Sequence, residues 1–159
     1  MLYFEDLHSD VLQVSGTYEL REDEIIAFAR EWDPQPFHID HEAAARSPLQ
    51  GLFASSVHTY AITSRLLSQL DRPIAAIAGV RNEIEMPGPA RPGDSLSLGI
   101  VLLDKRVSAS KPDRGLVTLA CELKNQHGSV VLRVRSLILV QRRPGADSGS
   151  LRGTRSPRA

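Results

Sequence analysis

The second half of the sequence alternates apolar and polar side chains in three successive runs, and this pattern constrains the fold more than any other feature. The runs cover residues 95–102, 117–123 and 130–140, with turns expected at 113–115 and 126–128. Because successive side chains of a strand point to opposite faces, each run predicts a strand with one apolar and one polar face. The sequence therefore predicts three consecutive antiparallel strands that share one apolar face.

A sheet with one apolar face needs a cover, and residues 54–70 have the composition of one. Only Arg65 is charged in this segment, and eight of its residues are Ala, Ser or Thr. A surface helix normally carries a charged face, so this segment is predicted to be a buried helix with close neighbours on most sides. The expected fold class is α+β, with a curved antiparallel β-sheet wrapped around a long central α-helix.

The first half of the sequence is predicted to contain two further helices, and two further strands are expected beside the three described above. Carboxylates at positions 22–24 favour a helix N-terminus, and prolines at 34 and 36 are expected to end that helix near Trp32. A short helix over 41–46 follows, with Asp40 as its cap. An opening strand is expected at 11–20 and another at 77–85.

Length and charge exclude several classes of protein. A length of 159 residues is too short for two full domains. The 19 Lys and Arg balance 19 Asp and Glu, and this lack of a basic surplus disfavours a dedicated nucleic-acid binder. A single cysteine rules out an internal disulfide and a Cys-based zinc cage. Residues 1–143 are predicted to form one domain, and the Gly-, Ser- and Arg-rich residues 144–159 a flexible tail.

No segment has the pattern of a membrane span or a targeting signal. The N-terminal ten residues are acidic and lack an apolar run, and the longest uncharged stretches are interrupted by polar side chains. A cytoplasmic location is therefore expected.

One proline-stiffened segment carries a candidate acid–base pair. Residues 32–41 read WDPQPFHIDH and place Asp33 and His38 five residues apart on what is predicted to be a rigid loop. A carboxylate and an imidazole held close together suit proton transfer to or from a water. On spacing alone an ordinary turn at Asp33 with a half-buried His38 remains an alternative.

The chain resembles the MaoC-like, (R)-specific enoyl-CoA hydratase family over about residues 10–141. The resemblance is carried by WDPQPFHID at residues 32–40, by GLFAS at 51–55 followed by His58 and Thr59, and by MPGPARPGDSL at 86–96. It implies the hot-dog fold and the reversible hydration of a trans-2-enoyl thioester to an (R)-3-hydroxyacyl thioester.

The resemblance also implies roles for individual residues. Asp33 and His38 are the implied catalytic pair, and the backbone N–H of Thr59 is the implied donor to the thioester oxygen. Gln35, Gly51 and His58 are implied to contact the substrate, whose acyl chain runs along helix 54–70. No cofactor is expected, because coenzyme A is part of the substrate, and a homodimer acting on acyl-CoA or acyl carrier protein thioesters is implied.

The sequence also bears on two alternative functions, a thioesterase and a non-catalytic binder, and on a metal site. A hot-dog thioesterase uses a carboxylate on or near the central helix, but residues 54–70 contain no Asp or Glu. A non-catalytic acyl-thioester-binding homologue stays open. The residues His38, Asp40, His41 and His58 fit no known metal-ligand spacing, so no metal is expected.

Overall fold

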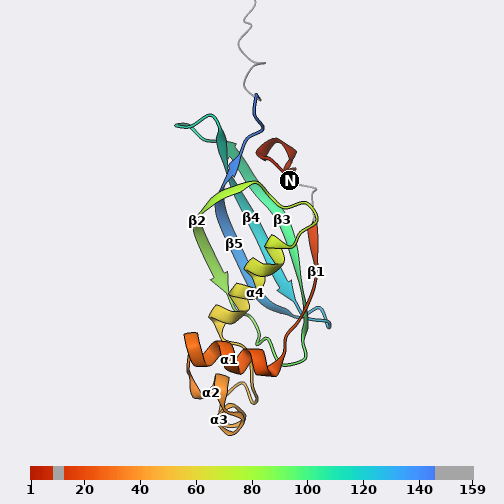
Figure 1. The fold of residues 1–159 in the computed structure, drawn as a ribbon, viewed down its shortest axis with the longest axis vertical. Helices are drawn as coiled ribbons and strands as arrows, with labels where there is room; N and C mark the ends of the chain where they lie inside the picture. Colours follow the sequence, from red (N-terminus) through yellow and green to blue (C-terminus); the bar gives the residue numbers. More distant parts are fainter. Residues whose placement is uncertain (9–12, 146–159) are drawn as a thin grey trace, which may run out of the picture.

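The computed structural model describes residues 1–8 and 13–145, and it has the predicted α+β architecture. Five strands form one antiparallel sheet in the order β1-β3-β4-β5-β2, and helix α4 (Ser56–Ser68) lies against it (Figure 1). The strands are β1 Gln13–Glu19, β2 Ala76–Glu85, β3 Ser95–Val107, β4 Arg114–Lys124 and β5 Val130–Gln141. From residue 146 onward the predicted tail lies outside the described residues, as do residues 11 and 12 of the predicted opening strand.

The predicted alternation is confirmed in the core. Every second residue of β4 is buried, from Gly115 to Leu123, and the apolar positions of β3 from Leu96 to Leu102 are buried as well. These side chains and those of α4 form one core. Among the described residues, no helix is long and apolar enough to cross a membrane.

The turn predicted at 113–115 is wrong in its position. The strands of this hairpin continue further, so that Gly115 pairs with Val107 inside the sheet. A Cβ at Gly115 would lie 2.3 Å from ring atoms of Phe4, which belongs to the short 3-10 helix η1 (Phe4–Asp6). The glycine is thus required for close packing of η1 on β4 rather than for a turn.

The first half is more helical than predicted. Helix α1 (Glu22–Trp32) and helix α3 (His41–Arg46) lie where expected, and the Asp40 carboxylate accepts the Ala43 N–H at 2.8 Å as a cap. The predicted loop between them is partly wrong, because it contains helix α2 (Pro36–Ile39). Proline at the first position of a helix needs no N–H partner and already has a helical φ angle, so Pro36 starts this turn.

Helix α4 is not buried on most sides of the single chain, contrary to prediction. It begins after the cap residue Ser55, and one face is exposed at Ser56, Val57, Ala61 and Ser64. The neighbouring edge strand β2 is exposed along its whole length. The small, uncharged residues that suggested burial within the chain therefore form an uncovered surface beside a free sheet edge.

Candidate active site

The junction between α1 and α2 brings Asp33 and His38 together. Asp33 ends α1, and its N–H donates to the Ala29 carbonyl at 2.9 Å. Two residues later, Gln35 is the N-cap of α2, and its carbonyl accepts the His38 N–H at 2.9 Å. The chain reverses within five residues, so the carboxylate at the end of one helix meets the imidazole on the next.

The surroundings of His38 indicate the tautomer of its neutral ring. The Asp33 Oδ2 lies 3.8 Å from His38 Nε2, and the imidazole is buried while the carboxylate is 26 % exposed. On the other side of the ring, His38 Nδ1 lies 2.9 Å from the Phe53 carbonyl oxygen. Because a carbonyl only accepts, Nδ1 carries the proton, and neutral His38 has a free lone pair on Nε2.

Two aromatic rings fix the plane of the imidazole. The rings of Phe37 and Phe53 each meet His38 edge-on, with centroids 4.6 Å away, and they stack on each other at 5.6 Å. The two edge-on ring contacts and the hydrogen bond to the Phe53 carbonyl together hold the imidazole in one orientation. His38 is therefore arranged to present Nε2 to Asp33.

A cavity of about 280 Å³ adjoins His38. Of the residues predicted for the site, only His38 and Thr59 are among its walls. The walls are formed by His38, Leu49, Phe53, Ala54, Ser56, Thr59 and residues 86–90.

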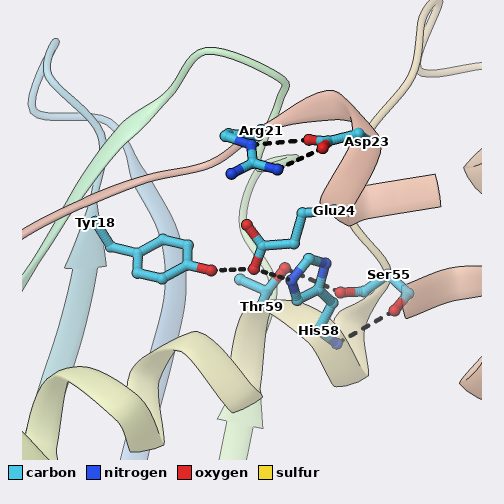
Figure 2. Close-up of polar contacts among 7 residues, drawn as sticks. All are labelled: Tyr18, Arg21, Asp23, Glu24, Ser55, His58 and Thr59. Atoms are coloured by element: carbon cyan, nitrogen blue, oxygen red, sulfur yellow. Dashed lines mark hydrogen bonds and ion pairs between the residues drawn. The ribbon is translucent and has the colours of Figure 1, made fainter. Parts of the chain in front are cut away.

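The amide of Thr59, the predicted donor to the thioester oxygen, makes a hydrogen bond within α4, and the amide of Ser56 lies at the cavity. The Thr59 N–H donates to the Ser55 carbonyl at 3.0 Å, which is the first regular hydrogen bond of α4. The Thr59 hydroxyl donates to the same carbonyl (Figure 2). The first amides of a helix have no acceptor within it, and Ser56 is the first residue of α4 and lines the cavity. The prediction started the helix at residue 54. Recognising Ser55 as an N-cap would have identified Ser56.

Comparisons with known proteins identify the family. A family model described as "MaoC like domain" matches residues 4–123. The chain belongs to this family. A crystal structure of the MaoC-like dehydratase from Rhodospirillum rubrum is 43% identical, covers 91% of this chain and 99% of its own, and superposes with a TM-score of 0.87.

Curated relatives of this MaoC-like protein differ in how far they are characterised. The uncharacterized protein YdeM of Bacillus subtilis is 31% identical over 134 residues, covering 82% of this chain and 94% of its own. A 3-hydroxybutyryl-CoA dehydratase of Methylorubrum extorquens is 28% identical over 154 residues, covering 96% and 92%. The predicted family and its hot-dog fold are confirmed.

Three residues of the MaoC-like motifs that were predicted to contact the substrate are not among the cavity walls. Gln35 is exposed at the start of α2, and Gly51 has a φ of 128° and donates its N–H to the Ala44 carbonyl at 2.9 Å. The imidazole of His58 is buried against α1, 3.4 Å from Glu24. The structure gives these residues contacts within the fold rather than with the cavity.

The second MaoC-like motif builds one wall of the cavity. Asp94 is buried, and its carboxylate accepts the Arg91 N–H at 2.8 Å. Just before this turn, the Ala90 carbonyl accepts the Ala54 N–H at 2.9 Å, which ties the wall to the segment before α4. The Gly-Asp of the motif thus anchors the wall.

The single cysteine is not among the walls of the cavity beside His38. Cys121 lies on the buried face of β4, as predicted, and burial raises the pKa of its thiol to about 11. Within the described residues, no three His, Cys, Asp or Glu side chains come together as a metal site would require.

Proposed function

We propose that this protein catalyses the reversible hydration of a trans-2-enoyl thioester to an (R)-3-hydroxyacyl thioester. The observation that carries the proposal is the 3.8 Å separation of Asp33 Oδ2 and His38 Nε2, with His38 Nδ1 bound to the Phe53 carbonyl. A water about 2.8 Å from each atom fits between the two groups and donates a hydrogen bond to both.

The chemistry needs one base and one proton donor, and the pair supplies both. His38 Nε2 accepts a proton from the water as the water oxygen bonds to the β-carbon. The electron pair of the C=C bond moves toward the thioester oxygen, and the Asp33–His38 pair returns a proton to the α-carbon. Water is thus divided into a hydroxyl on the β-carbon and a hydrogen on the α-carbon, and dehydration is the reverse.

The start of α4 is proposed to stabilise the negative charge that develops on the thioester oxygen. The Ser56 N–H lies at the cavity wall and at the positive end of the helix dipole, where a developing anion is stabilised. The amide of Ser56, and not that of Thr59, is therefore the proposed hydrogen-bond donor to the thioester oxygen.

A second cavity, of about 320 Å³, is proposed to receive the acyl chain. It lies between the second half of α4 and the sheet, with Leu67, Leu70, Leu119 and Ile138 among its walls. Ser64 lines it, and Ser56 lies two turns earlier on the same face of the helix. The acyl chain is proposed to follow that face from one cavity to the other.

The chain is further proposed to act as a homodimer. The edge strand β2 is exposed throughout, with Ile77, Val80 and Ile84 each more than 40 % exposed. Unpaired edges with apolar side chains are aggregation-prone unless another strand covers them. The uncovered face of α4 lies beside this edge, so a second copy is proposed to cover both surfaces.

An assay with crotonyl-CoA and two parallel readouts tests the activity. The conjugated enoyl-thioester absorbance is followed together with release of free thiol. We expect Asp33→Asn and His38→Ala each to lower kcat by about 100-fold or more, since each removes a group that transfers or orients the proton.

The sequence offers a matched control for each variant. Asp40→Asn and His41→Ala make the same chemical changes at exposed positions outside the cavity walls. Both controls are expected to keep wild-type turnover. Loss of absorbance without thiol supports the hydratase, thiol release indicates a thioesterase, and binding without turnover indicates a non-catalytic homologue.

A further inference from the structure

The helix that ends just before Asp33 and the helix that begins at Ser56 are joined by a partly buried polar contact. His58, in the first turn of α4, has an imidazole only 3 % exposed, and its Nε2 lies 3.4 Å from Glu24 Oε1 on α1. The Tyr18 hydroxyl of β1 donates to the same carboxylate oxygen (Figure 2). We call these three residues the Tyr18–Glu24–His58 clamp.

The clamp has one arrangement of protons. A carboxylate only accepts, so Tyr18 and His58 Nε2 each donate to Glu24. Burial and Glu24 together raise the pKa of Tyr18 to about 12, which keeps this hydroxyl a donor at neutral pH. The described residues provide no partner for His58 Nδ1, so Glu24 is the imidazole's hydrogen-bond partner within them.

Two rings and one cation complete the contact. Phe28, one turn after Glu24 on α1, stacks on the His58 ring with centroids 4.3 Å apart and planes 6° from parallel. The guanidinium of Arg65, on α4, lies 5.5 Å from the centre of the Tyr18 ring. α1 therefore holds His58 both by a hydrogen bond and by a stacked ring, and α4 is joined to β1 as well.

Each helix carries one part of the candidate site. Asp33 caps the end of α1, nine residues after Glu24, and α4 begins at Ser56, two residues before His58. The distance between the carboxylate of Asp33 and the amide of Ser56 depends on how these two helices are set against each other. Small misplacements of reacting groups are costly to a reaction that requires both at once.

We infer that the Tyr18–Glu24–His58 clamp positions Asp33 and the Ser56 amide relative to each other, with Glu24 as its central positioning residue. This inference rests on the proposed function. Glu24, Tyr18 and His58 are not among the walls of the cavity that holds His38. Asp33 does not line it either, but it lies 3.8 Å from His38, whereas the contacts of the three clamp residues join α1, α4 and β1. The clamp residues are therefore assigned a positioning role and not contact with the substrate.

The test compares two substitutions of Glu24 in the crotonyl-CoA assay. Glu24→Ala removes the shared acceptor, and we expect kcat to fall about tenfold with KM changed by less than about twofold, because transition-state geometry is disturbed more than binding. Glu24→Gln keeps an oxygen that accepts from Tyr18 and His58, and it is expected to restore kcat to within about threefold of wild type. The matched control is Glu22→Ala, because Glu22 pairs with His41 on the exposed side of the same helix.

Two results overturn the inference: wild-type kcat in Glu24→Ala, or an equal loss in Glu24→Gln, which indicates a role for the charge instead of the geometry. Where Glu24→Ala does not fold, Tyr18→Phe takes its place, since it removes a single hydroxyl. A lowered kcat with unchanged KM in Tyr18→Phe supports the inference, and a wild-type kcat overturns it.

Backbone amide NMR separates failure of the inference from failure of the proposed function. If the wild-type protein does not hydrate crotonyl-CoA, the proposed function fails and the clamp is still tested by the Asp33 and Ser56 amide signals. Shifts of both signals in Glu24→Ala, and of neither in Glu22→Ala, support the clamp. Unmoved signals in Glu24→Ala overturn it.

Discussion

At the scale of single residues, two buried histidines of similar exposure have different surroundings. His38 is fixed through Nδ1 by a backbone carbonyl and keeps Nε2 for a nearby carboxylate and a cavity. His58 has its Nε2 directed at Glu24 and an aromatic ring on one face. The first arrangement suits proton transfer, and the second suits a fixed structural contact.

The burial of His58 predicts a specific loss of stability in acid. Burial lowers its pKa below the usual 6.5, although Glu24 acts in the opposite direction. Below about pH 6.5 the unfolded chain therefore binds a proton that the folded protein does not, and the free energy of unfolding falls as the pH falls. His58→Gln is expected to lose less stability than wild type between about pH 7.5 and 5.5, measured by urea unfolding. Equal losses in the two proteins contradict this assignment.

At the scale of elements, the ends of the helices are more important to the site than their middles. Asp33 lies at the end of α1, His38 on the single turn of α2, and Ser56 at the start of α4. Helix ends leave backbone groups without partners, and caps determine which group is left free. The cap Ser55 thus decides that the amide of Ser56, and not that of Thr59, is available at the cavity.

Ser55→Ala tests this cap. The Ser55 hydroxyl accepts the His58 N–H at 3.2 Å and is buried, so its removal leaves a buried amide without an acceptor. We expect the free energy of unfolding to fall by about 1 kcal/mol, measured by chemical denaturation. Ser68→Ala, near the other end of α4 and exposed, is the control and should change stability by less than about 0.5 kcal/mol. Equal effects of the two substitutions argue against the cap.

At the scale of the whole molecule, three exposed large apolar side chains, Ile77, Val80 and Ile84, lie on the edge strand β2. The exposed face of α4 consists largely of small residues, and among the described residues no strand pairs with the outer side of β2. A single chain therefore leaves uncovered the helix on which both candidate cavities lie. This arrangement is the basis of the proposed homodimer.

Val80→Lys is expected to weaken the dimer. Val80 is 52 % exposed on β2, and a charge on an edge strand opposes addition of another strand. By light scattering, wild type should have twice the 17.5 kDa chain mass, and Val80→Lys should shift toward the monomer. Val107→Lys makes the same change at a 45 % exposed position on β3, which β4 and β5 separate from β2, and should leave the mass unchanged. A monomeric wild-type protein contradicts the proposed assembly.

Much of the fold was predictable because it depends on local periodicity. The alternation in β3 and β4 gives strands with one buried face, whereas in β5 the neighbours Val131 and Leu132 are both buried, contrary to prediction. The carboxylates in the first turn of α1 and the cap of α3 mark helix starts by short-range chemistry. The motif around Asp33 and His38 was equally readable, since both residues lie within one proline-bounded segment.

Only the tertiary structure decided which partners these residues have. His58 contacts Glu24, 34 positions earlier in the chain, and His38 contacts the Phe53 carbonyl, 15 positions later. Gly115 is small because Phe4 packs on it, not because the chain turns there. The sequence by itself determined the elements, because backbone preference and side-chain periodicity act over a few residues. The tertiary structure decided the site, because hydrogen bonds and ring contacts depend on which distant elements are brought together.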